Sequence, residues 1–249
     1  MRSGFVAILG PPNAGKSTFL NQVLGFKLAI TSDKPQTTRH RILGVHNDAQ
    51  RQVVFLDTPG LHAARRALNQ RMVQTALATL EEVDAVLFMA EVSPRGLQEA
   101  QEVAHQVLAG GKPVVLALNK IDLVANKTAL LPILQRVTAW GPWAAVVPIS
   151  AQTGDGCPAL LTELGRCLPE GQPLFPEDML TDLSERFLAG ELIREKVFRL
   201  TERELPYSVA VTVDEFLEPE EEGRPTAITA TIHAEREGQK AILIGKGGQ

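Results

Sequence analysis

The sequence predicts an α/β protein: a doubly wound, mostly parallel sheet with one antiparallel edge strand, followed by a smaller, partial α+β segment. Up to about residue 167, short apolar runs alternate with longer amphipathic stretches. This alternation is typical of a parallel sheet covered by helices on both faces. Beyond a proline-rich stretch at 169–179, the pattern changes to one helical stripe followed by two alternating strands.

Six runs have the composition of strands, being short, rich in β-branched or aromatic residues, and bounded by Gly, Pro or charge. These runs are 5–10, 40–46, 52–57, 84–90, 113–119 and 144–150. The helical stretches between them are 16–25, 67–82, 96–111 and one near 157–168. The runs 40–46 and 52–57 are joined by NDAQR, which leaves no room for a helix, so we expect an antiparallel hairpin there.

A domain boundary is expected at the proline-rich segment. We predict one domain over 1–168, a linker over 169–180, and a second domain over 181–249. In the second domain, 181–200 carries a helical apolar stripe, and 208–216 and 226–235 alternate like strands. The acidic stretch 217–225 between these strands is expected to be a solvated hairpin tip.

Composition limits the classes of function. The chain has 249 residues, 44% apolar and 22% charged, with a net charge of −4, so it lacks the global basic field of many nucleic-acid-binding proteins. Its two cysteines, Cys157 and Cys167, favour a reduced cytoplasmic compartment. No apolar run approaches the ~20 residues of a membrane-spanning helix. We interpret the N-terminus as a first strand and not as a signal peptide.

The segment GPPNAGKST, residues 10–18, follows the first strand and opens a helix. It matches GxxxxGK[ST], in which glycines let successive backbone N–H groups face a phosphate. Lys16 would reach the β- and γ-phosphates, and the Ser17 hydroxyl would complete a Mg²⁺ shell. A glycine-rich turn with an incidental lysine is the alternative, and the strand–helix position disfavours it. The predicted phosphate-binding residues are Gly10, Pro11, Pro12, Asn13, Ala14, Gly15, Lys16, Ser17 and Thr18.

The base is predicted by NKID at the end of the strand run 113–119. The Asp122 carboxylate can accept hydrogen bonds from the guanine ring N–H and exocyclic amine, and adenine offers neither donor. Asn119 would tie this loop to the phosphate loop, and the aliphatic stem of Lys120 would cover one face of the base. Ser150 and Ala151 open the loop after the last strand, where the Ala151 N–H could reach the guanine O6. Gln152 follows them.

A third motif, DxxG, falls between these two. Asp57, Thr58, Pro59 and Gly60 follow the strand run 52–57. In this context Asp57 would hold Mg²⁺ through a water, and the Gly60 N–H would sense the γ-phosphate. A threonine in KPQTTRHR must also close over Mg²⁺, and we favour Thr38 over Thr37. The predicted metal-binding residues are Ser17, Thr38 and Asp57.

The chain resembles the Era family of bacterial GTPases in GPPNAGKST, QTTRHRILG, DTPG, NKID and SAQTG. A second signature, RFLAGELIREKVF…ELPYSVAV…AEREGQKAILIGKGG, is similar to the start of a type II KH domain. The resemblance implies the phosphate-loop GTPase fold, GTP/GDP and Mg²⁺ as cofactors, and hydrolysis of GTP to GDP and phosphate. It also implies binding of small-subunit (16S) ribosomal RNA, assistance in small-subunit assembly, a cytoplasmic monomer, and peripheral association with the inner membrane.

Catalysis is expected to rest on Lys16, Thr38 and Gly60. Leu61 occupies the place where some GTPases carry a water-orienting glutamine, and an aliphatic side chain cannot orient water. The resemblance suggests that Asn13 helps to hold K⁺ against the phosphates, which would stabilise transition-state charge. A plain turn-forming asparagine is the alternative. We therefore expect slow hydrolysis, stimulated by K⁺.

RNA contact is expected at a GxxG loop, which lets nucleic-acid backbone approach closely. The loop residues are Gly245, Lys246, Gly247 and Gly248. From residue 180 onward there are 9 Lys and Arg against 14 Asp and Glu, and the KH pattern is incomplete at Gln249, so we expect weak RNA binding by this chain. Two alternatives stay open: an RNA-binding assembly factor with a structural nucleotide, and another ribosome-assembly or tRNA-modification GTPase.

Overall fold

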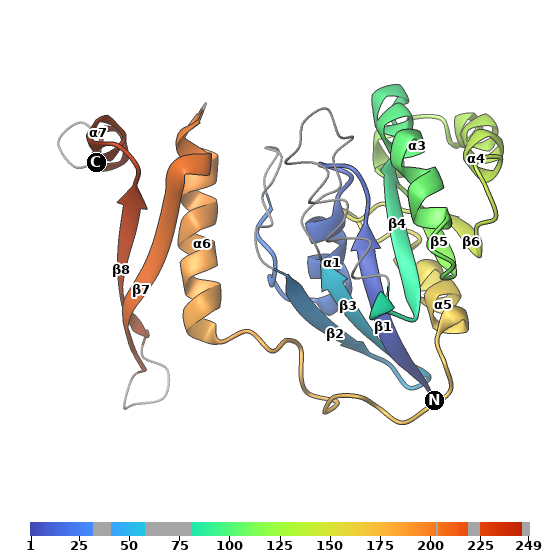
Figure 1. The fold of residues 1–249 in the computed structure, drawn as a ribbon, viewed down its shortest axis with the longest axis horizontal. Helices are drawn as coiled ribbons and strands as arrows, with labels where there is room; N and C mark the ends of the chain where they lie inside the picture. Colours follow the sequence, from blue (N-terminus) through green and yellow to red (C-terminus); the bar gives the residue numbers. More distant parts are fainter. Residues whose placement is uncertain (32–40, 58–80, 203, 219–224, 246–249) are drawn as a thin grey trace. The chain divides into compact units, whose positions relative to one another are not determined.

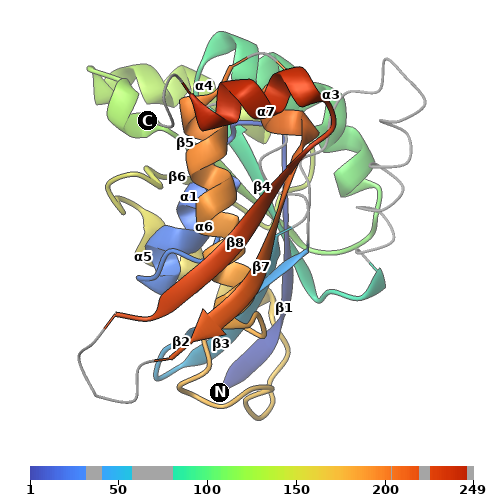
Figure 2. The same cartoon turned by 90° about the vertical axis from the view of Figure 1, so that its left-hand side faces the viewer.

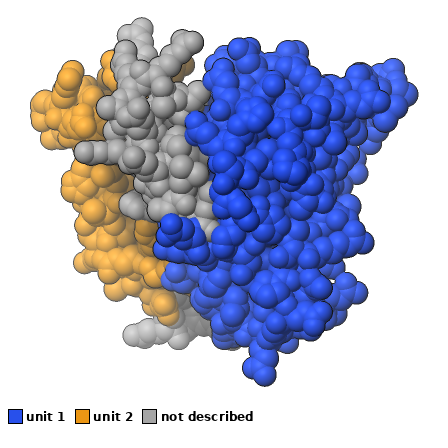
Figure 3. All heavy atoms as spheres, turned by 45° about the vertical axis from the view of Figure 1, so that its right-hand side comes forward, with its two compact units in different colours: residues 1–29, 35–182 blue, residues 30–34, 183–249 orange. Residues whose placement is uncertain are grey.

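A computed structural model of the chain describes residues 1–31, 41–57, 81–202, 204–218 and 225–245 (Figure 1). The chain divides into two compact units (Figure 3). Unit 1 comprises Met1–Ala29 and Pro35–Asp182, and unit 2 comprises Ile30–Lys34 and Leu183–Gln249. Residues 169–182 therefore group with unit 1.

Unit 1 is built on a six-stranded sheet (Figure 1). Its strands are β1 (Arg2–Leu9), β2 (Ile42–Asn47), β3 (Arg51–Asp57), β4 (Ala85–Glu91), β5 (Val114–Asn119) and β6 (Ala145–Pro148), in the order β2-β3-β1-β4-β5-β6. The pair β2–β3 is antiparallel and the other pairs are parallel. The predicted sheet, its hairpin and its antiparallel edge are confirmed.

Helices join the parallel strands. They are α1 (Lys16–Leu24), α3 (Pro94–Leu108), α4 (Leu130–Thr138) and α5 (Cys157–Cys167), with the short 3₁₀ turns η1 (Ile121–Leu123) and η2 (Lys127–Ala129). Helix α4 was not predicted from the sequence; it has only two and a half turns and carries Pro132 in its first turn. The predicted helix 67–82 falls mostly outside the described residues.

The core lies on both faces of this sheet. Strands β3 and β5 are buried along their whole length. On one face, Phe88 stacks on Trp143 and belongs to the same apolar cluster as α3 and α4. On the other face, Phe19 of α1 meets Phe55 of β3 edge to face, with ring centroids 5.6 Å apart. Burial on two faces explains why these strands read as continuous apolar runs.

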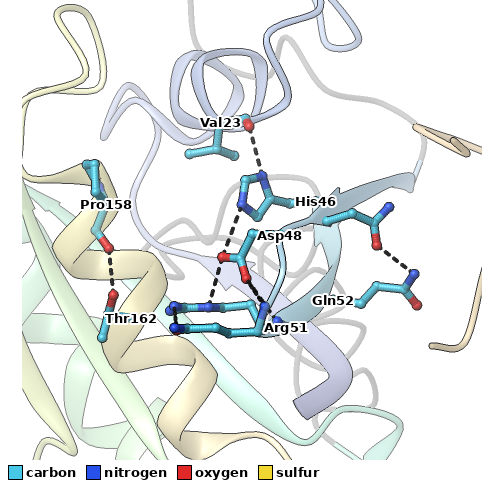
Figure 4. A network of polar contacts seen from close by, with 9 residues as sticks. Val23, His46, Asp48, Arg51, Gln52, Pro158 and Thr162 are labelled. Carbon is cyan, nitrogen blue, oxygen red and sulfur yellow. Dashed lines mark hydrogen bonds and ion pairs between the residues drawn. The ribbon is translucent and has the colours of Figure 1, made fainter. Parts of the chain in front are cut away.

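The turn of the β2–β3 hairpin is fixed by polar contacts (Figure 4). The Asp48 carboxylate accepts the backbone N–H groups of Gln50 and Arg51 and pairs with the Arg51 guanidinium at 2.9 Å. On β2, His46 Nδ1 lies 3.0 Å from the Val23 carbonyl oxygen in the last turn of α1. Because a carbonyl only accepts, Nδ1 carries the proton. These contacts hold the hairpin to α1.

The segment after α5 runs back along the sheet and pairs with it. The Gln52 side chain is fully buried, accepts the N–H groups of Leu174 and Phe175, and donates to the Phe175 carbonyl. Further along, the Val45 N–H donates to the Leu180 carbonyl at 2.8 Å, which covers the free edge of β2. The proline-rich segment is thus hydrogen-bonded to unit 1 and not a free tether.

Unit 2 is a small α+β assembly (Figure 2). It contains α6 (Glu185–Leu200), the 3₁₀ turn η3 (Leu205–Ser208), the antiparallel pair β7 (Val209–Leu217) and β8 (Ala227–Ala234), and α7 (Glu237–Ile244). The helix and two strands were predicted, whereas α7 was not. The Arg186 guanidinium of α6 donates to the carbonyl groups of Val213 and Asp214, at a bulge in β7.

Helix α6 also carries buried charge. Arg194 and Glu191 form a two-bond ion pair at 2.6 and 2.7 Å, with side chains 4% and 11% exposed. Glu195 is fully buried and pairs with Arg199, which also donates to the Thr31 carbonyl and hydroxyl oxygens. Paired charges of this kind cost less to bury than single ones. Within the described residues, no helix is long and apolar enough to cross a bilayer.

Candidate nucleotide-binding site

The loop between β1 and α1 has a backbone that only glycine can adopt at two positions. Gly10 and Gly15 have φ of 146° and 96°. A Cβ would lie 2.3 Å from the Met89 carbonyl oxygen at Gly10, and 2.1 Å from Asn119 Nδ2 at Gly15. Asn13 also has a positive φ, 61°, a region that asparagine tolerates. The loop therefore has the turn that a phosphate cradle requires.

Lys16 begins α1 and is buried within this loop. Its Nζ donates to the carbonyl oxygens of Gly10 and Pro11 at 3.0 and 2.8 Å. Burial lowers the pKa of Lys16 from 10.5 to about 8, and the nearby Asp57 carboxylate opposes that change. A phosphate would restore charge compensation to this ammonium. Lys16 thus lies inside the loop, at the N-terminal end of the helix, where anions bind.

Two predicted metal-binding residues face each other. Ser17 Oγ donates to Asp57 Oδ2 at 3.3 Å, and Asp57 is fully buried at the end of β3. A hydroxyl and a carboxylate oxygen are hard donors of the kind that Mg²⁺ prefers. Their chemistry and closeness fit that ion. The third predicted ligand, Thr38, and its alternative Thr37 lie outside the described residues.

Asn119 ties three segments together at the end of β5. Its Nδ2 donates to the Ala14 carbonyl of the phosphate loop at 2.7 Å, and its Oδ1 accepts the Ala151 N–H at 2.9 Å. All three residues are buried. A single side chain therefore sets the distance between the phosphate loop and the loop after β6. A contact from Ala151 to guanine O6 would share this N–H with Asn119.

Asp122 and Lys120 follow on the same loop. Asp122 lies in η1 and is exposed, as a carboxylate that receives a base from solvent must be. Lys120 has φ 69° and ψ 34°, the left-handed region, and its Nζ donates to Glu91 Oε2 at 2.7 Å. The Ile121 N–H donates to the Ile149 carbonyl, which fixes this turn to β6. Both predicted base residues thus leave the sheet at one edge.

The loop after β6 is internally hydrogen-bonded. The Ser150 N–H donates to the Asp155 carbonyl, the Gly154 N–H to the Ser150 carbonyl, and the Thr153 N–H to Ser150 Oγ. Gln152 is exposed at its tip. Lys127 pairs with the Asp155 carboxylate at 3.2 Å across the neighbouring turn. These contacts hold the loop in one defined shape beside Asn119.

Several predicted residues cannot be placed. Thr58, Pro59, Gly60 and Leu61, and the loop residues Lys246, Gly247 and Gly248, lie outside the described residues. Gly245 is described, with φ 73° directly after α7.

Sequence reasoning missed Glu91, because a single glutamate at a strand end belongs to no motif. What brings Glu91 to the site is its pairing with Asn119 between β4 and β5, and this pairing is known only once the register of the two strands is known.

Comparison with known proteins identifies the family. The profile of a family described as "50S ribosome-binding GTPase" matches residues 5–120. "GTPase Era" of Geobacter metallireducens is 50% identical over 250 residues, covering 99% of this chain and 82% of that protein.

Two solved structures extend the match over both units. The crystal structure of Aquifex aeolicus Era Y63A bound to GDP·AlF₄⁻ has a TM-score of 0.88 at 41% identity, and covers 100% of this chain and 84% of that chain. The structure of Era in complex with MgGDPNP and nucleotides 1506–1542 of 16S ribosomal RNA has a TM-score of 0.87 at the same 41% identity and the same coverage. The chain therefore belongs to the Era family of GTPases.

Proposed function

We propose that the chain is a guanine-nucleotide switch that hydrolyses GTP and acts on small-subunit ribosomal RNA. Membership of the family makes it a GTPase. One observation supports this assignment of the site most strongly. Asn119 joins the phosphate loop, through Ala14, to the loop after β6, through Ala151. A nucleotide that spans these two loops would place its phosphates at Lys16 and its base at Asp122.

Binding is divided between the two ends of the nucleotide. The loop N–H groups from Gly10 to Thr18 and the Lys16 ammonium would hold the phosphates, aided by the dipole of α1. Asp122 would accept the guanine N–H groups, while Ser150, Ala151 and Gln152 would border the base. An adenine would leave the carboxylate without those donors, which selects guanine.

Ser17, Asp57 and Thr38 would hold Mg²⁺. When bound, the ion neutralises charge between the β- and γ-phosphates. For the chain's own residues, Lys16 stabilises the charge that develops on the phosphate oxygens, and Thr38 and Gly60 close on the γ-phosphate. Loss of that phosphate releases the segments that carry Thr38 and Asp57–Gly60, which is the switching event.

A monovalent ion is the second part of the catalytic proposal. Asn13 lies in the phosphate loop with a left-handed backbone, φ 61°, and Leu61 supplies no water-orienting group. K⁺ held by Asn13 against the phosphates would stabilise the transition state. Equal turnover in sodium and potassium buffers would rule out this role.

The RNA assignment comes from a relative. An Era protein forms a complex with MgGDPNP and nucleotides 1506–1542 of 16S ribosomal RNA. We infer that this chain acts on the same region in assembly of the small subunit, through Gly245–Gly248, as a cytoplasmic monomer. Peripheral attachment to the inner membrane stays a prediction. The net acidic charge after residue 180 makes us expect affinity weaker than micromolar for this chain alone.

Calorimetry with GDP, GTP and ATP in Mg²⁺ tests the base assignment. The wild type should bind both guanine nucleotides and not ATP, and Asp122→Asn should lose GDP affinity by about a hundredfold or more. Asp122→Asn should gain xanthosine diphosphate, because an amide can donate to the xanthine carbonyl. Asp178→Asn, which changes an exposed carboxylate in the proline-rich segment, is the matched control and should bind GDP as the wild type does.

Tight ATP binding by the wild type, or unchanged guanine preference in Asp122→Asn, would overturn the assignment.

A second experiment separates the switch from an assembly factor with a structural nucleotide. Single-turnover GTP hydrolysis is measured beside RNA affinity with GTP and with GDP. A switch hydrolyses GTP and binds RNA with different affinity in the GTP and GDP states. If the nucleotide is only structural, GTP is not hydrolysed and the RNA affinity is the same with GTP and with GDP.

A further inference from the structure

Glu91, the last residue of β4, lies next to the base-binding loop without belonging to any of its motifs. It pairs in register with Asn119 on β5, one residue before Lys120. Its Oε2 accepts a hydrogen bond from Lys120 Nζ at 2.7 Å, with the two side chains 25% and 31% exposed. The ion pair is therefore partly shielded from water, where it is stronger than a fully exposed one.

The backbone of Glu91 is fixed from two sides. On the β5 side, the Val92 N–H donates to the Asn119 carbonyl at 3.0 Å, which continues the ladder past the strand end. On the helix side, a Cβ at Gly96 would lie 2.7 Å from Glu91 Cβ, so the first turn of α3 packs directly on this residue. Ser93 caps that turn by accepting the Gly96 N–H. The carboxylate thus projects from a rigid base.

Lys120 is constrained in a complementary way. Its φ of 69° is in the left-handed region, which a lysine seldom adopts without support. The Leu123 N–H donates to its carbonyl at 3.1 Å, which fixes the backbone, and Glu91 fixes the opposite end of the side chain. With both ends held, the methylene stem has few alternative rotamers. Arg95, on the first turn of α3, pairs with Glu99 at 2.8 Å and not with Glu91.

We propose that Glu91 is a positioning residue for nucleotide binding: it holds the Lys120 ammonium so that the methylene stem lies ready against one face of the guanine. This rests on the assignment of Lys120 to the base made above. A free lysine would lose its rotamer freedom when the base binds, whereas a stem already fixed loses little. Glu91 thereby slows dissociation of the nucleotide, whereas Asp122 determines which base binds.

The test is the dissociation rate of a fluorescent GDP analogue from the full chain, in the variant Glu91→Gln. Because preorganisation acts mainly on dissociation, we expect the rate to rise about three- to tenfold with association unchanged. The preference for GDP over ADP should not change, because Asp122 is untouched. Urea unfolding without nucleotide should differ from the wild type by no more than about 1 kcal/mol, the usual contribution of one partly exposed ion pair, whereas a general structural role would cost more.

A double-mutant cycle isolates the lysine. Lys120→Met keeps a methylene stem but removes the ammonium, and it should itself speed dissociation. In that background, Glu91→Gln should change the rate by less than about twofold, since the group through which it acts is gone. Glu163→Gln is the matched control, because Glu163 forms a similar 2.6 Å pair with Arg166 on α5 and is 29% exposed.

Each outcome is decisive. If Lys120→Met holds GDP as the wild type does, holding the ammonium contributes nothing to binding and the positioning role of Glu91 is overturned, while the stem assigned to the base is still present. If Lys120→Met loses GDP faster but Glu91→Gln does not, only the positioning role is overturned. A full effect of Glu91→Gln in the Lys120→Met background shows that Glu91 acts by another route, which also overturns the proposal.

Discussion

Gly15 and Asn119 make the closest approach in the candidate site. The absent side chain of Gly15 leaves room for Asn119 Nδ2, which lies 2.1 Å from where a Cβ would be. That room lets the amide reach the Ala14 carbonyl at 2.7 Å. The glycine is thus required twice, by its φ of 96° and by this contact.

Gly15→Ala should abolish most nucleotide binding. The methyl group would displace Asn119 and open the link between the two loops, so we expect GDP affinity to fall more than about tenfold. Gly111→Ala is the control, because Gly111 also has a positive φ, 72°, but its Cβ would meet nothing within 4 Å. It should lose about 1 kcal/mol of stability from backbone strain and keep its nucleotide. Equal GDP affinity in the two variants would refute the steric argument.

Cys157, at the start of α5, follows the base loop. It is 5% exposed, and burial, aided by the Asp155 carboxylate, raises its pKa from 9.0 to about 11. Burial also raises the pKa of Cys167, which is less deeply placed. The folded Cys157 therefore keeps a proton that the unfolded chain releases between pH 9 and 11, so its contribution to stability falls as pH rises through that window.

Urea unfolding at pH 8 and pH 10 measures this effect. The wild type should lose about 1 kcal/mol more between the two pH values than Cys157→Ala does. The comparison cancels the other groups that titrate in this range. At pH 8 a thiol reagent should label Cys167 before Cys157, and GDP should slow labelling of Cys157 alone. Parallel pH profiles for wild type and Cys157→Ala would contradict the assigned pKa.

At the scale of elements, Asn21 connects α1 to the chain that follows it. Its Oδ1 accepts the N–H groups of Leu28 and Ala29 at 2.9 and 2.8 Å, and its Nδ2 donates to the Ala29 carbonyl at 2.7 Å. Leu28 and Ala29 are buried, and the Leu28 N–H also donates to the Phe26 carbonyl at 3.0 Å, so Asn21 adds to the bonding of Leu28 and supplies both side-chain contacts to the Ala29 backbone. One residue of α1 thus shapes the loop beyond the helix.

Asn21→Ala should destabilise the chain by about 2–3 kcal/mol, since it leaves three buried backbone groups without this partner. Asn21→Asp keeps both acceptor contacts but loses the donor and sets a carboxylate oxygen against the Ala29 carbonyl oxygen, so it should cost about 1–2 kcal/mol. Urea unfolding of both variants checks this order. A cost for Asn21→Asp equal to that for Asn21→Ala would show that the single donor bond matters most.

The sequence was informative where a pattern repeats along one element. The buried strands, the hairpin and α6 follow from local periodicity, and the phosphate loop and NKID follow from motifs whose chemistry is local. Helix α4 was missed because it has only nine residues and carries Pro132 in its first turn, although Leu130, Ile133, Leu134 and Val137 follow a helical spacing. The pairing of Glu91 with Lys120 was missed because it depends on the register of two strands, which no single segment encodes.

At the scale of the whole molecule, the segment after α5 belongs to unit 1 as far as Asp182. Gln52 holds its middle through Leu174 and Phe175, and the Thr181 hydroxyl donates to the Leu43 carbonyl at 2.7 Å near its end. At this boundary the chain passes from unit 1, which ends at Asp182, to α6, which begins at Glu185, so the connecting segment is only a few residues long. The proline-rich composition predicted a linker over 169–180.

Gln52→Ala should release the proline-rich segment. With its buried anchor removed, a glutamate-specific protease should cut after Glu177 several times faster, whereas the wild type should resist because cleavage needs local opening. Gln50→Ala, which changes an exposed glutamine in the hairpin turn, should behave as the wild type does. Identical cleavage after Glu177 in wild type and Gln52→Ala would mean that Gln52 does not hold the segment.

The chain crosses between the two units more than once. Ile30 and Thr31 come from between α1 and β2 yet group with unit 2, where Arg199 donates to the Thr31 carbonyl and hydroxyl oxygens. A fragment that ends at residue 182 would lack Arg199. Among the described residues, Arg199 is the one cationic side chain that donates hydrogen bonds to Thr31. Measurements on such a fragment would report Thr31 without these contacts, so nucleotide exchange needs to be studied on the uncut chain.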